Sequence, residues 1–272
     1  MAIKKKLSTL VLALAVASAG TTITACSSTT SSSTTNRWQP TLSLVSEQEA
    51  VSQSAEAYDK VIAEAKNSNA LNTNAAMTKR VKNIANKLIA KAPELRADSK
   101  NWDWQVNVIT SDEVNAWCMA GGKIAVYTGI IKTLDLTDNE LATVIGHEMA
   151  HALREHSREQ MSNQVAKQGA FTIASMLGVS DNVLSISDVV ATVGIGLPFS
   201  RAQETEADNV GLELMYKAGF DPEKGINIWN KMISLSKGQE KSVIDNLLSS
   251  HPSDTDRLNN LQQLAAQLKA KK

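Results

Sequence analysis

The stretch His147-Glu148-Met149-Ala150-His151 decides how the fold of this chain is interpreted. It has the form His-Glu-x-x-His. Its two histidines are four residues apart, so in a helix both imidazoles lie on one face and can reach a single zinc ion. The glutamate beside the first histidine can then reach a water molecule on the metal. This is the minimal apparatus for metal-assisted peptide hydrolysis. Five letters also occur by chance, so the surrounding sequence has to support the interpretation.

The residues before this stretch predict that it lies in the middle of a helix. Thr137-Asp138-Asn139-Glu140 has the pattern of a capping box, in which the threonine and the glutamate satisfy backbone groups at a helix N-terminus. Apolar residues follow at helical spacing, namely Leu141, Val144, Ile145 and Ala152. The two histidine side chains are therefore expected to project from one rigid helix.

The histidine that follows does not extend the motif as a third ligand. Metzincins continue with a glycine and a third histidine, but here Arg154 stands in the glycine position and His156 falls one residue early. At about 100° per residue, His156 lies about 140° around a helix from His151 and points away from the ligand face. We interpret His156 as a structural or surface residue.

A carboxylate from a second helix supplies the third ligand in this interpretation. Glu204-Thr205-Glu206-Ala207-Asp208 places Glu204 and Asp208 on one helix face. Glu204 would bind zinc, and Asp208 would accept the outer N–H of His147 and so fix its ring. Glu206 points elsewhere and is the weaker candidate for a ligand. An acidic pair at this spacing is otherwise typical of a solvated helix face.

The N-terminus has the pattern of a targeting signal. Three lysines at positions 4–6 precede an apolar run from 7 to 19, which is too short to span a membrane. The signal ends at Ile23-Thr24-Ala25-Cys26, which resembles a bacterial lipobox, so we expect residues 1–25 to be removed and Cys26 to carry lipid. Ser27 resembles a signal for the outer membrane, with the protein facing the periplasm. The alternative is an ordinary signal peptide beside a cysteine.

The mature chain divides into a tether and one domain. Residues 26–41, rich in Ser and Thr, are expected to form a flexible tether, and residues 42–272 a zinc metallopeptidase domain. The 28 basic and 28 acidic residues form no basic patch, which argues against a nucleic-acid partner. Once Cys26 is lipidated, Cys118 is the only thiol. We expect it to be buried, with a disulfide to another chain or a regulatory thiol as alternatives.

The patterning predicts an α+β domain that is mostly helical. Helices are expected at about 46–65, 77–88, 202–218, 222–236 and 254–270, and strands at 105–110 and 122–128. Residues 162–199 are apolar, rich in small residues and broken by glycines and Pro198. We interpret them as two core helices, and helices that cover the cleft or touch the membrane surface are the alternative.

Together these motifs resemble a family of zinc peptidases that includes the CAAX prenyl proteases and the bacterial HtpX- and BepA-type peptidases. One departure is Cys118-Met119-Ala120 before Gly121-Gly122, where the family often has proline. In its lipobox, its compact size and its lack of a helical repeat, the chain resembles the members of this family that are outer-membrane lipoproteins. The matching stretches are Asn115-Ala116-Trp117, the strand from Gly122 to Gly129, His147 to His151, Ser200-Arg201 to Asp208, and His251-Pro252 with Arg257-Leu258.

The resemblance implies a gluzincin-type domain with a small sheet beside the active-site helix. It implies one zinc ion per chain, on His147, His151 and Glu204. It also implies that His251 and Arg257 lie at the cleft, where they stabilise the oxyanion or occupy a zinc position in the idle enzyme. Without the resemblance, both would be interpreted as exposed residues.

The expected activity is endopeptidase cleavage of unfolded or misfolded envelope proteins, with Glu148 as general base. The strand with Gly122, Ile124 and Val126 would hold the substrate as an added β-strand, which only extended chains can form. An envelope protease or assembly factor is the class of partner that this role suggests. Two alternatives stay open: a periplasmic chaperone or assembly factor whose zinc site is closed by His251, and an inert lipoprotein with chance motifs.

Overall fold

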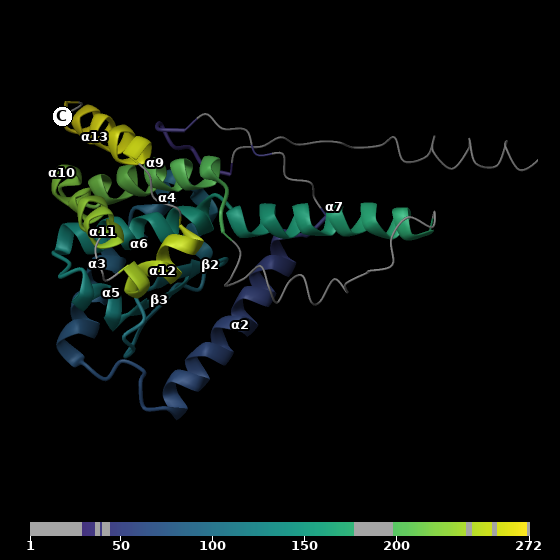
Figure 1. Ribbon diagram of the computed structural model, residues 1–272, viewed down its shortest axis with the longest axis horizontal. Coiled ribbons are helices and arrows are strands. Elements are labelled where there is room, and N and C mark those ends of the chain that lie inside the picture. Colours follow the sequence, from purple (N-terminus) through teal and green to yellow (C-terminus); the bar gives the residue numbers. More distant parts are fainter. Residues whose placement is uncertain are drawn as a thin grey trace, which may run out of the picture.

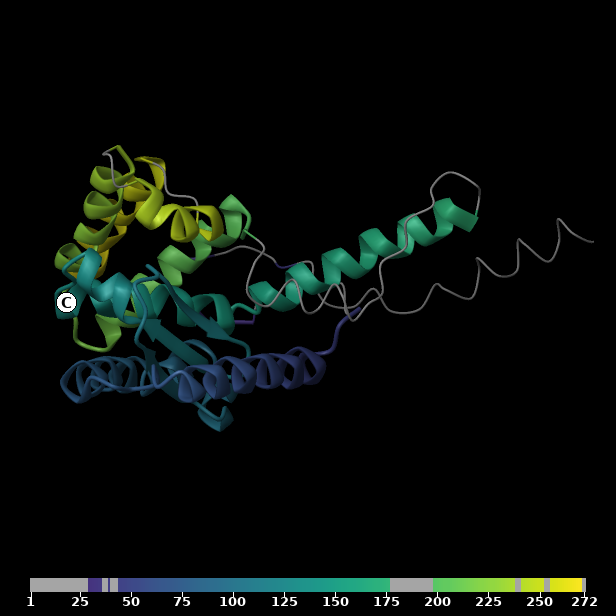
Figure 2. The ribbon, with the colours of Figure 1, turned by 60° about the horizontal axis from the view of Figure 1, so that its bottom comes forward.

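The computed structural model describes residues 29–35, 39, 44–176, 198–237, 241–251 and 255–270. The predicted signal segment 1–25 and the lipidation site Cys26 lie outside these residues. Within them, most of the chain is helical and a small sheet lies beside the central helices, as Figures 1 and 2 show. The predicted α+β class is therefore confirmed.

Two helices precede the sheet where the apolar spacing predicted them. α2 (Glu47–Asn67) begins after Ser46, whose hydroxyl accepts a hydrogen bond from the backbone N–H of Glu49. α3 (Ala75–Ile89) is capped by Asn74 and buries the apolar face that contains Val81 and Leu88. The short helix α4 (Ala92–Leu95) and a 3-10 turn, η1 (Ala97–Asn101), lead into the first strand.

The sheet has three strands in the order β1-β3-β2. β1 (Gln105–Ile109) and β3 (Lys123–Tyr127) are parallel, with Val106 opposite Ile124. β2 (Ala116–Met119) pairs with β3 on its other edge in the antiparallel sense. The strand periodicity predicted β1 and β3 but not the four-residue β2. Gly121 and Gly122, with φ of 77° and 85°, form the tight turn from β2 to β3, a conformation that glycine adopts readily.

The central helix, α6 (Asp138–Leu153), carries the His-Glu-x-x-His stretch and packs against both β2 and α9 (Arg201–Lys217). Its capping box forms as predicted, with Thr137 and Glu140 each satisfying the other's backbone N–H. Every residue from Glu140 to Leu153 is buried. The metal-binding motif thus lies on the most enclosed helix of the described part of the chain.

The remaining helices lie around α6 and α9. The short α5 (Thr128–Thr133) follows β3. The helix expected at 222–236 is divided into α10 (Pro222–Gly225) and α11 (Asn227–Lys237). α12 (Lys241–Ser250) was not predicted, and α13 (Thr255–Ala270) matches its expected range.

The apolar stretch from 162 onward is described only in part. α7 (His156–Met176) runs outward from the body of the molecule in both views (Figures 1 and 2). The second helix expected before 199 falls at 177–197, outside the described residues. Among the helices that the structure does describe, none combines the length and the apolar character that crossing a bilayer requires.

Part of the Ser/Thr-rich segment lies against the domain. Residues 29–35 run beside α9 (purple in Figure 1), where the side chains of Ser32, Ser33 and Thr34 all reach the carboxylate of Glu213. The sequence led us to expect a flexible tether here. In the structure, residues 29–35 have hydrogen-bond partners on the domain, and most of the rest of the predicted tether lies outside the described residues.

Candidate metal site

α6 presents His147, Glu148 and His151 from one helix. All three side chains are buried, with exposed fractions of 5%, 6% and 2%. Ring nitrogens Nε2 of His147 and His151 lie 3.1 Å apart. The helix therefore places the two imidazoles as the four-residue spacing predicted.

α9 supplies the two predicted carboxylates. Glu204 lies in its first turn and Asp208 one turn later, and both are buried among polar partners. Asp208 Oδ1 lies 3.0 Å from Nδ1 of His147 and accepts its outer N–H. The His147 ring therefore points Nε2 toward Glu204, 3.5 Å from its Oε2.

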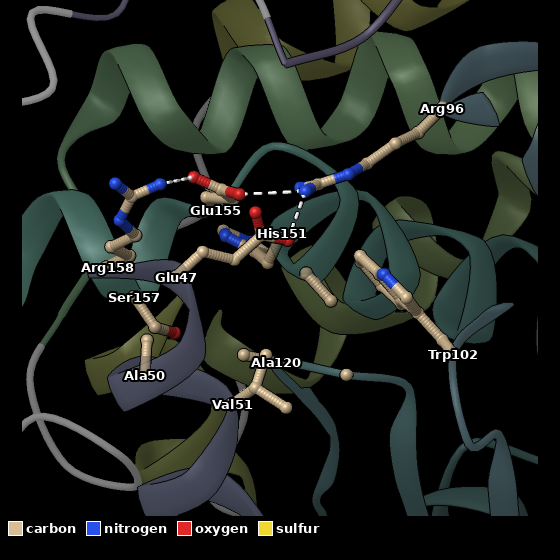
Figure 3. A pocket seen from close by; sticks show the side chains of 12 residues that line it. Glu47, Ala50, Val51, Arg96, Trp102, Ala120, His151, Glu155, Ser157 and Arg158 are labelled. Atoms are coloured by element: carbon tan, nitrogen blue, oxygen red, sulfur yellow. Dashed lines mark hydrogen bonds and ion pairs between the residues drawn. The ribbon is translucent and has the colours of Figure 1, made fainter. Parts of the chain in front are cut away.

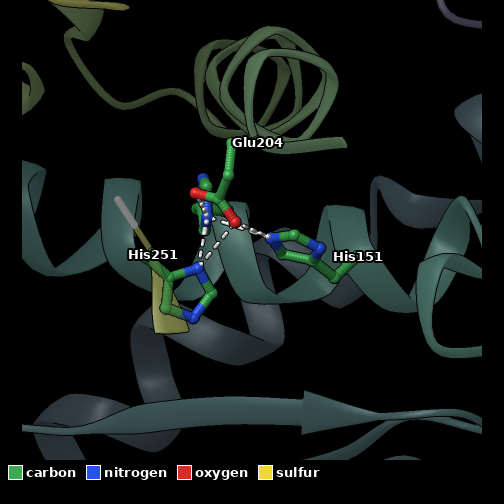
Figure 4. Close-up of side chains that lie close together, drawn as sticks. His151, Glu204 and His251 are labelled. Atoms are coloured by element: carbon green, nitrogen blue, oxygen red, sulfur yellow. Dashed lines mark hydrogen bonds and ion pairs between the residues drawn. The ribbon is translucent and has the colours of Figure 1, made fainter. Parts of the chain in front are cut away.

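Four possible ligand atoms converge at one point, from His147, His151, Glu204 and His251. They all lie within 4.8 Å of one another. Figure 4 shows Glu204 pointing from its helix toward the rings of His151 and His251. Their individual separations are 3.1 Å between His147 and His151, 3.3 Å between His147 and His251, 3.4 Å between His151 and Glu204, and 3.0 Å between His251 and Glu204.

These separations fit a metal ion. In a tetrahedral zinc site with bonds of about 2.0 Å, ligand atoms lie about 3.3 Å apart. Three imidazole nitrogens that face one another cannot all be satisfied by hydrogen bonds among themselves, because neighbouring lone pairs would repel. A cation at the centre satisfies every one of them, and nitrogen and carboxylate oxygen are ligands that zinc accepts.

The ionisation of Glu204 and His151 suits metal binding. Burial opposes the charge on Glu204, but hydrogen bonds with the three histidines outweigh it and hold the pKa of that carboxyl far below its usual range. Burial lowers the pKa of His151 well below its usual value. Burial also lowers the pKa of His147, yet hydrogen bonds with Asp208 and Glu204 outweigh that effect and raise it to about 10. An ionised Glu204 and a neutral His151 are the forms that bind a metal, whereas His147 is protonated at neutral pH in the metal-free site and must release this proton when a metal binds.

Glu148 lies beside the cluster and lines an adjoining pocket. Its Oε1 lies 3.6 Å from Nε2 of His251. Burial raises the pKa of the Glu148 carboxyl. A carboxylate with a raised pKa, placed beside the ligand atoms without being one of them, has the position and basicity of a general base.

Arg257 lies at the cleft beside Glu148 and contacts the carboxylates on α9. Its Nε and Nη2 donate to the two oxygens of Asp208 at 2.6 and 2.7 Å, and Nη1 lies 2.8 Å from Glu204 Oε2. Its guanidinium is therefore engaged with the carboxylates on α9. In this arrangement Arg257 holds Glu204 and Asp208 in place, and its expected role toward an oxyanion stays a prediction.

His156 is a buried structural residue and not one of the converging ligand atoms, as predicted, but the helical angle used to predict this does not hold. The helix that carries the motif ends at Leu153, and Glu155 has a φ of 54°, so the chain turns before α7 begins at His156. The angle extrapolated around one continuous helix does not apply across this turn. His156 is fully buried, and its Nδ1 lies 2.9 Å from Nδ1 of His151.

Phe199 is a site residue that the sequence did not reveal. Its ring stacks on His151, with centroids 3.8 Å apart, and lies 5.8 Å from the ring of His251. The backbone N–H of Phe199 bonds to Ser250 O at the end of α12. Only tertiary contacts bring this aromatic residue, just before α9, to the metal ligands.

The predicted substrate strand is also corrected. Gly122 lies in the turn, and Ile124 and Val126 lie on β3, whose two edges are already paired with β1 and β2. A peptide cannot add to β3, because its backbone groups have partners in the sheet. Among the described strands, β2 ends the sheet on the side that packs against α6, so an added strand would have to pair there.

Two pockets adjoin the cluster on different sides. One lies between α2 and the turn after α6 and is lined by His151, Gly121 and a group of charged residues. Figure 3 shows Glu155 in this pocket between Arg96 and Arg158, with which it forms ion pairs at 2.8 and 2.6 Å. The charges here compensate one another, so this side of His151 is held by a closed ionic network.

The second pocket, which we call the apolar pocket, opens beside Glu148. His147, Glu148, His251 and Arg257 form its polar end. Its remaining walls are apolar side chains from α5, α6, α11 and α12, namely Ile130, Val144, Ile228, Trp229, Met232 and Leu247. An apolar cavity that adjoins a few convergent polar groups is typical of a site that holds one side chain of a ligand.

Known proteins resemble this chain over the same region. The family model described as Peptidase family M48 matches residues 75–265. The chain is similar to the mitochondrial metalloendopeptidase OMA1 of Arabidopsis thaliana, with 33% identity over 174 residues, 64% of this chain and 34% of that protein. It is 29% identical to the metalloprotease LoiP of Escherichia coli over 192 residues, 70% of this chain and 71% of LoiP.

A further relative is the beta-barrel assembly-enhancing protease of Yersinia pestis, 25% identical over 202 residues, 71% of this chain and 40% of that protein. The chain spans between a third and a half of the length of the OMA1 proteins of Arabidopsis and two yeasts.

A His-Glu-x-x-His helix that meets a glutamate from a second helix defines a metallopeptidase of the gluzincin type. The chain belongs to peptidase family M48. This confirms the family that the motifs suggested, and the match to LoiP supports a likeness to that protein.

Proposed function

We propose that this chain is a zinc-dependent endopeptidase, tethered to the bacterial outer membrane by lipid on Cys26, that cleaves unfolded or misfolded envelope proteins in the periplasm. The observation that carries the proposal is the convergence of His147, His151, Glu204 and His251 within 4.8 Å, beside the uncoordinated Glu148. Similarity to the metalloprotease LoiP supports proteolysis, and similarity to the beta-barrel assembly-enhancing protease supports a link to β-barrel assembly.

His147, His151 and Glu204 would hold one zinc ion, which when bound polarises a water molecule and the scissile carbonyl. Glu148 takes the proton of that water and later delivers it to the leaving amine. Asp208 and Arg257 keep His147 and Glu204 oriented throughout. The chain thus supplies the base, the ligands and the groups that fix them.

His251 closes the site at rest in this proposal. Its Nδ1 lies 3.3 Å from His147 Nε2 and 3.0 Å from Glu204 Oε1, the separations of a fourth ligand. A zinc site with four protein ligands has no position for the catalytic water. His251 must therefore move away from the other ligand atoms before a substrate is cleaved. The ring of Phe199 contacts both His151 and His251, so we expect it to move together with His251.

The apolar pocket supports unfolded chains as substrates. It lies beside Glu148 and would receive one apolar side chain next to the scissile bond. Such side chains are buried in folded proteins and exposed in unfolded ones. Extended substrate backbone along the β2 edge would add main-chain hydrogen bonds without selecting a sequence.

Removal and return of the metal test the proposal. Full-length protein should cleave casein at internal bonds, lose this activity in a chelator and regain it when one equivalent of zinc is added. Mass spectrometry of the fragments separates internal cleavage from trimming of ends. Full activity in the metal-free protein would overturn the proposal. Cys26→Ser should release the protein from the outer-membrane fraction, and continued membrane association would contradict the lipid anchor.

A chaperone or assembly factor with a closed zinc site is the second candidate, because His251 already has the position of a fourth ligand. Under that function, aggregation of an unfolded client would be suppressed equally by the wild type and by Glu148→Gln. No internal fragments would appear with either protein.

A further inference from the structure

α9 has a second row of polar residues, away from the metal ligands, that binds the N-terminal segment 29–35. Glu206, Asn209 and Glu213 are spaced by three and four residues and so share a helix face. Glu206 and Glu213 are 2% and 4% exposed. Carboxylates this deeply buried require hydrogen-bond partners.

The N-terminal segment supplies many of those partners. The hydroxyl groups of Ser32 and Thr34 donate to Glu213 Oε2 at 2.7 and 3.2 Å, and the backbone N–H of Ser33 donates to the same oxygen at 3.1 Å. Asn209 Nδ2 donates to the carbonyl of Thr34. These contacts give the segment a specific register on α9.

At its end, the segment meets a chain of buried hydrogen bonds that leads to the metal site. Thr35 Oγ1 donates to Glu206 Oε1 at 2.8 Å. Glu206 Oε2 accepts from Nε2 of His156 at 2.9 Å. His156 Nδ1 is then left as the acceptor for Nδ1–H of His151, at 2.9 Å. His151 thereby presents the lone pair of Nε2 to the ligand cluster.

Arg154 links the same chain to the segment by a second route. Its Nη2 lies 2.6 Å from Glu206 Oε1, and its Nη1 donates to Thr30 Oγ1 at 3.0 Å. Arg154 and His156 are both fully buried. The groups that orient His151 are therefore packed directly beneath the segment.

We propose that the docked segment 29–35 is a positioning element of the metal site, acting through Thr35, Glu206 and His156 to orient the ligand His151. The proposal rests on the proposed function only in taking His151 as a metal ligand. Glu206, which we predicted to be the weaker ligand candidate, binds His156, and His156 in turn binds the ring nitrogen of His151 that faces away from the cluster. Release of the segment from α9 loosens His151, so attachment of the N-terminus and retention of the metal are coupled.

Zinc release from the full-length protein tests this coupling. The probe is zinc itself, transferred to a chromophoric chelator from zinc-loaded protein, with the cobalt absorption spectrum as a second readout of ligand geometry. Thr35→Val removes the hydroxyl and keeps the side-chain shape. Because partners that orient a ligand change metal affinity about 10- to 100-fold, we expect the zinc dissociation constant to rise about 10-fold.

Two variants control for effects of the substitution itself. Thr29→Val makes the same change in the same segment, where the hydroxyl contacts Gln39 and not Glu206, and should bind zinc as the wild type does. Thr35→Ser restores a hydroxyl and should restore the affinity.

Equal zinc affinity and an unchanged cobalt spectrum in Thr35→Val and the wild type would overturn the inference. So would an equal loss of affinity in Thr29→Val, since it would point to a general effect on the segment. Failure of the wild-type protein to bind zinc would instead contradict the proposed function, so the two failures are distinguishable.

Discussion

Gly146 of α6 and Gly211 of α9 face each other at the point where the two ligand helices cross. A methyl group on Gly146 would lie 2.9 Å from Gly211 O, and one on Gly211 would lie 2.7 Å from the backbone nitrogen of His147. Both distances are too short for a real contact. The two glycines therefore allow the backbones to approach until His147 meets Glu204 and Asp208.

Gly211→Ala should separate the two helices and weaken the metal site. Overpacking of this kind costs about 1–3 kcal/mol of unfolding free energy, and the shift of α9 should also lower zinc affinity. Gly219→Ala is the control. Position 219 lies away from the site and has a φ of 87°, so alanine strains the backbone there, but nothing lies within 4 Å of the added atom. It should lose stability and keep zinc. Wild-type zinc affinity in Gly211→Ala would refute the spacing argument.

His251→Ala should open the site. If His251 is the fourth ligand at rest, its loss leaves zinc on three residues and frees a position for water, so casein cleavage should rise while the zinc content stays at one per chain. A fall in kcat of about 100-fold or more would instead assign His251 to oxyanion stabilisation, whose loss has that magnitude.

Met232→Trp should fill the apolar pocket and change specificity. Met232 is one wall of the cavity beside Glu148. The larger ring should shift cleavage from bonds next to large apolar residues to bonds next to small ones, as read from the fragments of a peptide library. Ser234→Trp adds the same ring to the exposed face of α11 and should leave the preference unchanged. Identical fragment patterns for all three proteins would place the substrate side chain elsewhere.

Cys118 should be inert in the folded protein. It is buried on β2, and burial, with the nearby charge of Glu148, raises the pKa of its thiol well above the usual range. Because the thiolate is the reactive form, alkylation at pH 8 should modify Cys118 only after unfolding. Peptide mapping after iodoacetamide treatment checks this. Rapid labelling of the native protein would revive a regulatory role for the thiol.

Glu140 should stabilise the start of the motif helix in a pH-dependent manner. Burial opposes its charge, but hydrogen bonds with Lys231 and Thr137 outweigh burial and lower its pKa below 4.5. Its stabilising effect is therefore present above its unfolded-state pKa and is lost as the pH falls through the lower folded-state value. Glu140→Gln keeps an acceptor for the backbone N–H of Thr137 but removes the charge that pairs with Lys231, so it should cost about 0.5–1 kcal/mol at neutral pH.

The difference in unfolding free energy between wild type and Glu140→Gln should shrink as the pH falls below about 4.5. Urea unfolding at a series of pH values measures it. A difference that stays constant down to acid pH would exclude ionised Glu140 as its source.

The sequence predicted those parts of the site that depend on spacing within one helix. His147 and His151 share a face of α6, and Glu204 and Asp208 share a face of α9, because helical geometry alone fixes which residues are neighbours. The capping box at Thr137 is equally local. These features needed no knowledge of tertiary contacts.

The features that were missed depend on turns and long-range packing. His156 reaches His151 because the chain turns at Glu155, which helical extrapolation cannot anticipate. Phe199 meets the ligands through the end of α12. β3 is unavailable to a substrate because the short β2 pairs with it, and four residues give too little periodicity to predict a strand.

Peptide cleavage by Glu148→Gln at full zinc occupancy tests the central claim most directly. The side chain is isosteric, so this variant should bind one zinc per chain as the wild type does, yet its kcat on casein should fall at least 100-fold, because general-base catalysis contributes about 10²–10⁴. Glu64→Gln, on the exposed face of α2, makes the same change elsewhere and should retain full activity. Wild-type turnover by zinc-loaded Glu148→Gln would contradict the account.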